Sequence, residues 1–339
     1  MIENNNETDE KNDFFSMLSK LPGMPEDPAG QMLVICRPKV EGCGEDCFLA
    51  LQKDERFFCG VFDGCGGSGG KVYPAFGGHT GAWAASRAAA ASAGEWFLSG
   101  FQNKNKEAPE LASYVRKYLK TCKEQDTGGQ VLLGSLSKDF PTTIAAFCMN
   151  DTKGNIVDFY WCGDSRCYVL DKDGLHQVTA DDSAVQDAMQ NLREDAAMTN
   201  VASASQDFIL HRGTKKIRKP AVILAATDGC FGYLLSPMEW ERTLLETMHC
   251  ASSEEKWMDL LDERIGKVSG DDYTLTAWPH GFRSFTEMKQ TFEARLSFLE
   301  KNYPAAESEE ELFRQWEKYR NGYESMLAEC KEDPERGWE

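Results

Sequence analysis

The sequence lacks a long apolar run. Its uncharged apolar stretches, such as residues 221–226, are far shorter than the roughly 20 residues that a helix needs to cross a bilayer. The chain begins Met1-Ile2-Glu3-Asn4, without the basic start, apolar run and cleavage site of a secretory signal. We therefore expect no transmembrane segment and a cytoplasmic location.

Positive charge is scarce. The chain has 55 acidic against 37 basic side chains, a net charge of −18, and no long Lys/Arg cluster. Such a surface repels polyanions, so we expect neither nucleic acid nor an anionic membrane as a partner. The one basic run, residues 215–219, is interpreted as a solvated turn before a strand, and the alternative that it steers an anionic substrate stays open.

Cysteine is frequent but lacks the arrangement of a disulfide framework or a zinc site. The sequence has 12 cysteines. Several fall in predicted strands: Cys36, Cys59, Cys148, Cys162 and Cys167. Without an export signal, buried free thiols are the better interpretation. Cys43 and Cys47 have a spacing that could begin a zinc site, but the sequence has no second Cys/His pair at the spacing of zinc ligands.

The 339 residues, 41% of them hydrophobic, suffice for one large core and an appended element. Residues 1–30 are polar and then Pro/Gly-rich, which predicts a mobile N-terminal segment. We expect a catalytic domain over 31–280 and a C-terminal helical hairpin over 281–331.

Strand and helix patterns come in blocks. Strands are predicted at 32–36, 48–52, 57–62, 142–150, 156–162, 166–170, 175–179, 221–227 and 273–278, and helices at 81–97, 109–122, 237–248 and 253–268. Residues 181–219 between them are expected to be irregular. Because strands and helices come in blocks and do not alternate strictly, we predict an α+β fold, an antiparallel β-sandwich flanked by helices.

The C-terminal region carries two capping boxes, beginning at Ser284 and Ser308. The first predicted helix has an apolar stripe that includes Met288 and Phe292, and the second has one that includes Trp316 and Tyr319. Two alternatives stay open: the stripes pack onto the core of the same chain, or they form a homodimer or partner surface.

Carboxylates next to glycine lie at the ends of predicted strands. The segments are Gly44-Glu45-Asp46, Phe62-Asp63-Gly64, Thr227-Asp228-Gly229 and Gly270-Asp271-Asp272. Any one of the Asp-Gly pairs is typical of a plain turn. Together they would place acidic groups at sheet ends, where their repulsion destabilises the fold unless a cation neutralises it. Oxygen ligands of this kind favour Mg²⁺ or Mn²⁺.

Over residues 31–279 the sequence resembles the metal-dependent protein phosphatases of the 2C type. The matching segments, in the family's order and spacing, are Glu45-Asp46-Cys47-Phe48, Val61-Phe62-Asp63-Gly64-Cys65-Gly66-Gly67, Cys162-Gly163-Asp164-Ser165-Arg166, Val178-Thr179-Ala180-Asp181-Asp182-Ser183, Ala226-Thr227-Asp228-Gly229 and Asp271-Asp272-Tyr273-Thr274. The resemblance implies the phosphatase 2C fold and hydrolysis of phosphoserine or phosphothreonine in proteins, by attack of a water that bridges two divalent cations.

The resemblance also implies a role for each matching residue. Asp63 would bridge two Mn²⁺ or Mg²⁺ ions, with Asp228 and Asp271 completing the first site, and these three carry the catalysis. The second site would use Glu45 and the backbone carbonyl of Gly64. Asp164 would contribute to a third, weaker site. Asp46 and Asp272 would contact the metal-binding residues without binding the ions themselves.

Among the departures from the family pattern are three positions and one insertion. Glu41 stands where the family often has a phosphate-binding arginine, so Arg37 or Lys39 is the candidate substitute. Cys65 replaces a histidine that is a proposed general acid, and Gly232 replaces an acidic residue, which weakens the case for a third metal. Residues 68–80 are predicted to be a flexible insertion, with His79 as a speculative acid.

Three hypotheses for function follow. The first is an active serine/threonine protein phosphatase. The second is a catalytically weak binding or scaffold protein that docks a partner through the C-terminal hairpin. The third is a small-molecule phosphatase, because substrate choice depends on variable loops around the site.

Overall fold

Two antiparallel five-stranded sheets form the centre of the protein. The structure is a computed structural model and describes residues 16–19, 32–100, 107–125, 139–150, 155–194 and 196–328. The first sheet has the order β1 (Leu33–Arg37), β12 (Tyr273–His280), β11 (Ala221–Ala226), β8 (Arg166–Asp171) and β9 (Gly174–Gln177). The second has the order β10 (His211–Lys216), β7 (Ile156–Cys162), β6 (Ile144–Asn150), β3 (Arg56–Phe62) and β2 (Cys47–Lys53). The N-terminal segment predicted to be mobile, except for residues 16–19, lies outside the described residues.

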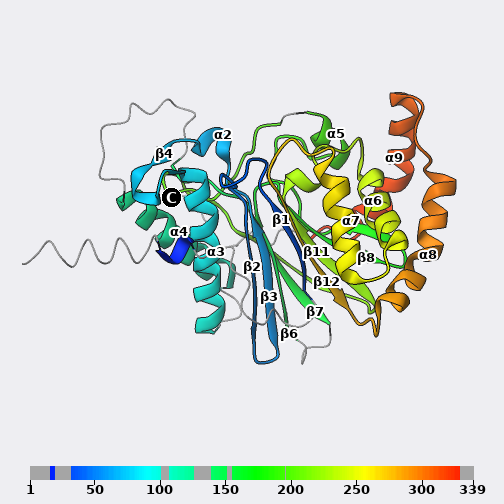
Figure 1. Ribbon diagram of the computed structural model, residues 1–339, viewed down its shortest axis with the longest axis horizontal. Coiled ribbons are helices and arrows are strands. Elements are labelled where there is room, and N and C mark those ends of the chain that lie inside the picture. Colours follow the sequence, from blue (N-terminus) through cyan, green and yellow to red (C-terminus); the bar gives the residue numbers. More distant parts are fainter. Residues whose placement is uncertain are drawn as a thin grey trace, which may run out of the picture.

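The sheets face each other, and helices cover their outer faces (Figure 1). The second sheet is covered by α3 (Gly81–Ser99) and α4 (Glu107–Glu124). The first is covered by α6 (Pro237–Cys250), α7 (Glu254–Gly266), α8 (Phe285–Asn302) and α9 (Glu309–Tyr323). This arrangement confirms the predicted antiparallel sandwich flanked by helices.

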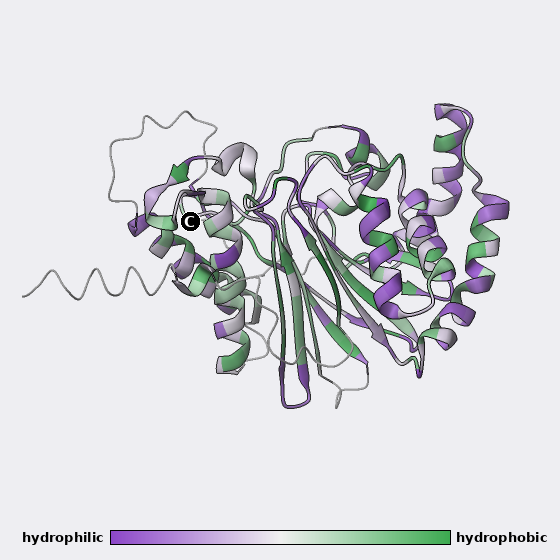
Figure 2. Ribbon diagram, in the orientation of Figure 1, coloured by the Kyte–Doolittle hydropathy of each residue, from purple (hydrophilic) through white to green (hydrophobic). Residues whose placement is uncertain are grey.

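The alternation of side chains along β3 explains why its whole sequence is apolar. Phe57 and Val61 point into the core between the sheets, whereas Phe58 and Phe62 point toward α3. Both faces of the strand are therefore buried. Figure 2 shows the result, with hydrophobic residues concentrated on the strands and hydrophilic residues on the outer helices.

Two segments are more ordered than the sequence predicted. Residues 181–219 were expected to be irregular, but β10 pairs with β7, and α5 (Ala188–Arg193) lies in the same segment. The prediction failed because β10 is an edge strand rich in charged residues, which lacks an apolar pattern. The insertion at 68–80 was expected to be flexible, yet its Tyr73 and Phe76 are buried against Phe140.

The C-terminal helices belong to the same core as the sandwich. Ser284 and Ser308 cap α8 and α9 as predicted, accepting hydrogen bonds from the backbone N–H groups of Glu287 and Glu311. The stripe residues are buried in the core cluster around the first sheet: Met288, Phe292, Leu296, Leu299, Trp316, Tyr319 and Tyr323. Of the two alternatives, packing onto the core of the same chain is the one observed. Residues 329–331 of the predicted hairpin lie outside the described part.

The cysteines agree with the prediction of free thiols. Every cysteine in the described residues is a free thiol, and most are buried, including Cys47, Cys59 and Cys167. Among the helices described, none combines the length and hydrophobicity required to cross a membrane.

His176 connects the end of α9 to the first sheet through hydrogen bonds. Its Nδ1 lies 2.7 Å from the carbonyl oxygen of Gly322, and its Nε2 lies 3.1 Å from Oδ1 of Asp171. Both partners are acceptors, so both ring nitrogens donate when the imidazole is protonated. Burial alone would lower the pKa of His176, but the hydrogen bonds to Asp171 and Gly322 raise it overall. Burial would likewise raise the pKa of Asp171, but the bonds from His176 and Asp173 lower it.

Replacing His176 should lower the free energy of unfolding, and the size of the loss should depend on pH. The raised pKa of His176 gives stability that is present below about pH 6.5 and is lost as pH rises through the folded-state value. The lowered pKa of Asp171 gives stability that is present above about pH 4 and is lost as pH falls. We expect His176→Gln to lower the unfolding free energy by about 1 kcal/mol near pH 5.5 and by less at pH 9. Urea denaturation at both pH values measures this, and a loss independent of pH would contradict it.

Candidate active site

The strand ends that carry the predicted ligands meet at one end of the sandwich. Cys47 at the start of β2 pairs with Phe62 at the end of β3. In the first sheet, Ala226 at the end of β11 pairs with both Arg166 and Leu275, near the starts of β8 and β12. Residues immediately beyond these positions therefore gather at the end opposite the β2–β3 hairpin turn (Figure 1). We call Glu45, Asp63, Asp164, Asp228 and Asp271 the carboxylate cluster.

Asp63 lies at the centre of the cluster. Its backbone carbonyl accepts hydrogen bonds from the Thr142 hydroxyl and the Thr143 N–H, both at 2.8 Å, which fixes the chain after β3. Burial raises the pKa of Asp63 well above its ordinary range, and the charges of Asp46, Asp228, Asp164 and Asp271 raise it further. Because the charges of four other carboxyl groups raise the pKa of Asp63, Asp63 lies within electrostatic range of all four.

Asp228 contacts Asp63 directly. It follows β11 and opens a short 3-10 turn, where its carbonyl accepts from the N–H of Gly232 at 2.6 Å. Burial and the charge of Asp271 raise the pKa of Asp228, whereas a hydrogen bond with the Asp63 carboxyl group lowers it. Two carboxyl groups can share such a bond only when one is protonated, and Asp63 has the more strongly raised pKa.

Asp271 lies at the rim of the cluster, and Asp272 behind it. Asp271 is exposed, and its Oδ1 accepts from the N–H of Asp272 at 2.8 Å. The carboxylate of Asp272 accepts from the N–H groups of Lys39 at 2.5 Å and Glu45 at 2.6 Å. Asp272 thus holds the segment before β2 in place.

Glu45 is oriented by the first turn of α3. The Thr80 hydroxyl, which also caps α3, donates to Oε1 of Glu45. On the other side, a Cβ added to Gly66 would lie 2.1 Å from Oε2, so only glycine leaves room there. Burial raises the pKa of Glu45, and the charges of Asp272 and Asp271 contribute.

Asp46 lies beneath the cluster and is 4% exposed. Its Oδ2 accepts from the Thr227 hydroxyl at 2.9 Å, which ties it to the residue before Asp228. Burial raises the pKa of Asp46 to about 8, and the charges of Asp272 and Asp228 add to the effect. The Asp46 carboxyl group therefore lies on the buried side of the cluster, away from solvent.

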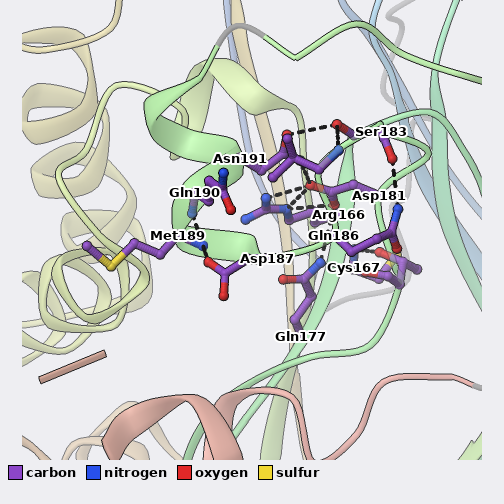
Figure 3. Close-up of polar contacts among 12 residues, drawn as sticks. Arg166, Cys167, Gln177, Asp181, Ser183, Gln186, Asp187, Met189, Gln190 and Asn191 are labelled. Carbon is purple, nitrogen blue, oxygen red and sulfur yellow. Dashed lines mark hydrogen bonds and ion pairs between the residues drawn. The ribbon is translucent and has the colours of Figure 1, made fainter. Parts of the chain in front are cut away.

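Asp164 is two residues before Arg166, which lies in a polar network with Asp181 and Asn191 (Figure 3). Burial raises the pKa of Asp164 to about 8, followed by the charges of Asp228 and Asp181. Arg166 is 1% exposed and pairs with Asp181 through two nitrogens, at 2.8 Å and 2.6 Å. Asp181 also accepts from Asn191 of α5 at 2.5 Å.

The C-terminal helix reaches this network through α5. Asp187 caps α5 by accepting from the N–H groups of Met189 and Gln190. Its Oδ2 also accepts from the Trp316 indole at 3.1 Å and pairs with Arg320 at 2.8 Å, both from α9. A continuous set of contacts therefore joins α9 to the polar network beside Asp164.

The two cations proposed for the substrate phosphate are bonded to another part of the chain. Arg37 pairs with Asp262 of α7 at 2.9 Å. Lys39 donates from Nζ to the carbonyl of Ser269 at 2.8 Å. Neither contact is with the carboxylate cluster.

His79 and Arg87 flank the α3 side of the site. His79 stacks on Trp83 at 4.1 Å, and burial lowers the pKa of its imidazole, which favours the neutral form. Arg87 is 6% exposed and lies 4.4 Å from the centre of the Trp83 ring. Sequence reasoning missed Arg87 and Thr80, and the only signal for Thr80 was its position before a predicted helix.

The donor set fits a hard divalent cation. It contains only carboxylate and backbone carbonyl oxygens, and mutual repulsion among its carboxylates is what a cation relieves. Glu45, Asp63, Asp164 and Asp228 are partly exposed and Asp271 is exposed, so the cluster is open to solvent. Within the residues that the structure describes, no three His, Cys, Asp or Glu side chains are placed so that they could hold a metal ion as they stand.

Serine/threonine phosphatases are among the known proteins of similar fold. A family model described as protein phosphatase 2C matches residues 40–266. The chain is similar to the Staphylococcus aureus serine/threonine phosphatase Stp1, with 16% identity, a TM-score of 0.58, and coverage of 76% of this chain and 98% of that one. It is also similar to the S. agalactiae serine/threonine phosphatase, with 14% identity, a TM-score of 0.54, and coverage of 74% and 100%.

The Mycobacterium tuberculosis serine/threonine phosphatase PstP/Ppp is 16% identical, with a TM-score of 0.52 and coverage of 74% of this chain and 100% of that one. At such identities these structures establish the fold alone. No curated protein matches the sequence. The family model covers more than half of the chain, and the protein therefore belongs to the protein phosphatase 2C family of phosphoprotein phosphatases.

Proposed function

We propose that this protein hydrolyses phosphoserine and phosphothreonine in cytoplasmic proteins, using two Mn²⁺ or Mg²⁺ ions. The observation that carries the proposal is the convergence of Asp46, Asp164, Asp228 and Asp271 on Asp63, from positions far apart in the sequence. Divalent cations, when bound, supply an activated water and neutralise charge on the phosphoryl group.

The residues divide into two sets of ligands. Asp63 would serve both ions, and Asp228 and Asp271 would complete the first set. Glu45 and the carbonyl of Gly64 would form the second set, and Asp164 would contribute to a third, weaker site. The hydrogen bond from Thr80 supports this division, because it leaves Oε2 of Glu45 available as a ligand.

The rest of the chain would hold these ligands in place before substrate arrives. Asp272 fixes the backbone of Glu45, Thr142 and Thr143 fix that of Asp63, and Thr227 links Asp46 to the strand before Asp228. Such preorganisation lowers the cost of assembling the site around a phosphate monoester.

The scaffold hypothesis was motivated by Glu41, by Gly232 and by the aromatic stripe of the C-terminal hairpin. The stripe does not favour it, because Trp316, Tyr319 and Tyr323 are buried within this chain. A partner surface at α8 and α9 would have to use their outward residues, such as Phe298 and Phe313, which are partly exposed.

A substrate comparison tests the proposal. Purified protein is assayed against phosphoserine and phosphothreonine peptides and against phosphorylated metabolites, with Mn²⁺, with Mg²⁺ and with EDTA. We expect turnover only with added metal and a higher kcat/KM for the peptides. Turnover in EDTA would contradict the metal-dependent mechanism, and a clear preference for metabolites would support the small-molecule phosphatase.

A further inference from the structure

Three basic side chains that flank the carboxylate cluster already have partners within the chain. Arg37 is paired with α7, Lys39 is bonded to a backbone carbonyl, and Arg87 of α3 is buried and donates to the backbone carbonyls of Trp83 and Glu45. Position 41, where the family resemblance places a phosphate-binding arginine, is an exposed glutamate. The structure therefore raises the question of which protein group contacts the phosphoryl oxygens of a substrate.

Tyr233 lies beside the cluster, in the turn that follows β11. It follows the 3-10 turn that begins at Asp228, and 48% of it is exposed. Burial raises the pKa of its phenol, and the charges of Asp271, Asp228 and Asp63 raise it further. These are the three carboxylates assigned to the first metal site, so the phenol lies on that side of the cluster.

Gly270 fixes the position of the Tyr233 ring. A Cβ added to Gly270 would lie 2.5 Å from Cε1 and 2.9 Å from the hydroxyl oxygen of Tyr233. The ring therefore rests directly on the backbone before Asp271, at a place where only glycine allows it. Within the described residues the Tyr233 hydroxyl has no hydrogen-bond partner.

A neutral donor suits this position better than a cation does. A lysine or arginine beside Asp228 and Asp271 would pair with the carboxylates and compete with a metal ion for them. A phenol remains uncharged at neutral pH, donates one hydrogen bond, and leaves the carboxylates free.

We propose that the Tyr233 hydroxyl donates a hydrogen bond to a phosphoryl oxygen of the substrate, in place of the arginine that position 41 lacks. This inference rests on the proposed function, because it requires a phosphate monoester at the carboxylate cluster. Tyr233 is then a substrate-binding residue that contributes equally to binding of the substrate and of the phosphate product.

Tyr233→Phe tests this, because it keeps the ring on Gly270 and removes only the hydroxyl. In the Mn²⁺-loaded protein we expect KM for a phosphopeptide and the calorimetric Kd of inorganic phosphate each to rise about tenfold. We expect kcat to change by less than about twofold, because the bond is made in the ground state as well. The control is Tyr118→Phe on α4, whose hydroxyl contacts Glu95, and we expect both constants to stay within about twofold of wild type.

Each outcome bears on a different claim. Unchanged KM and unchanged phosphate Kd in Tyr233→Phe would overturn this inference and leave the proposed function standing. A fall in kcat with an unchanged phosphate Kd would also overturn it, because the hydroxyl would then act outside substrate binding. Wild-type protein without Mn²⁺-dependent turnover would overturn the proposed function, and this inference with it.

Discussion

Asp63→Asn is expected to reduce metal-dependent hydrolysis by on the order of a thousandfold or more. Asp63 is the one carboxylate shared by both proposed ligand sets, and an amide is a much poorer ligand for a hard divalent cation. Asparagine has the same shape, and the backbone bonds from Thr142 and Thr143 do not depend on the side chain. The loss therefore reports on the carboxylate rather than on the fold. Steady-state kinetics with a phosphopeptide and Mn²⁺ measure it.

The same substitution should raise thermal stability without metal. Burial and the charges of neighbouring carboxylates make ionisation of Asp63 unfavourable in the folded state, and asparagine removes that cost. The control is Asp173→Asn, which changes an exposed turn aspartate beside Lys172 and should alter neither activity nor the melting temperature. A variant that loses activity together with stability would indicate a damaged fold and would count against this account.

Arg295→Ala is expected to lower the unfolding free energy by about 3–5 kcal/mol. Arg295 of α8 binds both carboxylate oxygens of Glu241 in α6, at 2.7 Å and 2.8 Å, and Glu241 is fully buried. The Tyr319 hydroxyl of α9 donates to the same carboxylate at 2.6 Å. Without Arg295, Glu241 would be a buried charge with only one neutral partner. Urea denaturation measures the loss.

An exposed ion pair provides the matched control. Arg283 pairs with Glu287 at 3.0 Å, but 88% of its side chain is exposed, so Arg283→Ala should leave the unfolding free energy nearly unchanged. Replacing both Arg295 and Glu241 by apolar residues of similar size should recover most of the stability lost by Arg295→Ala. Equal losses for Arg283→Ala and Arg295→Ala would show that the buried pair does not anchor the C-terminal helices.

The sequence predicted those helices and strands in which the pattern of apolar residues matches the residues that are buried. Most strands of the two sheets and the helix caps at Ser284 and Ser308 were predicted, because each depends on neighbouring residues. β10 was missed because an edge strand with charged residues has no apolar pattern. The docking of α9 could not be decided, because an apolar stripe does not reveal which surface will cover it.

The candidate site was predictable to a similar degree. Carboxylates beside glycine at strand ends located Asp63, Asp228 and Asp271, and the strand register explains why they meet. Thr80 and Tyr233 were not predicted, because their contacts with the cluster arise only when α3 and the turn after β11 come together in three dimensions. Such contacts have no signature in local sequence.

The most direct test of the central claim is a calorimetric titration of Mn²⁺ into the metal-free protein. The carboxylates gathered around Asp63 predict two tightly bound ions per chain, with Asp228→Asn losing one of them. Binding of no Mn²⁺ by the wild-type protein, or identical binding by the Asp228→Asn variant, would contradict it.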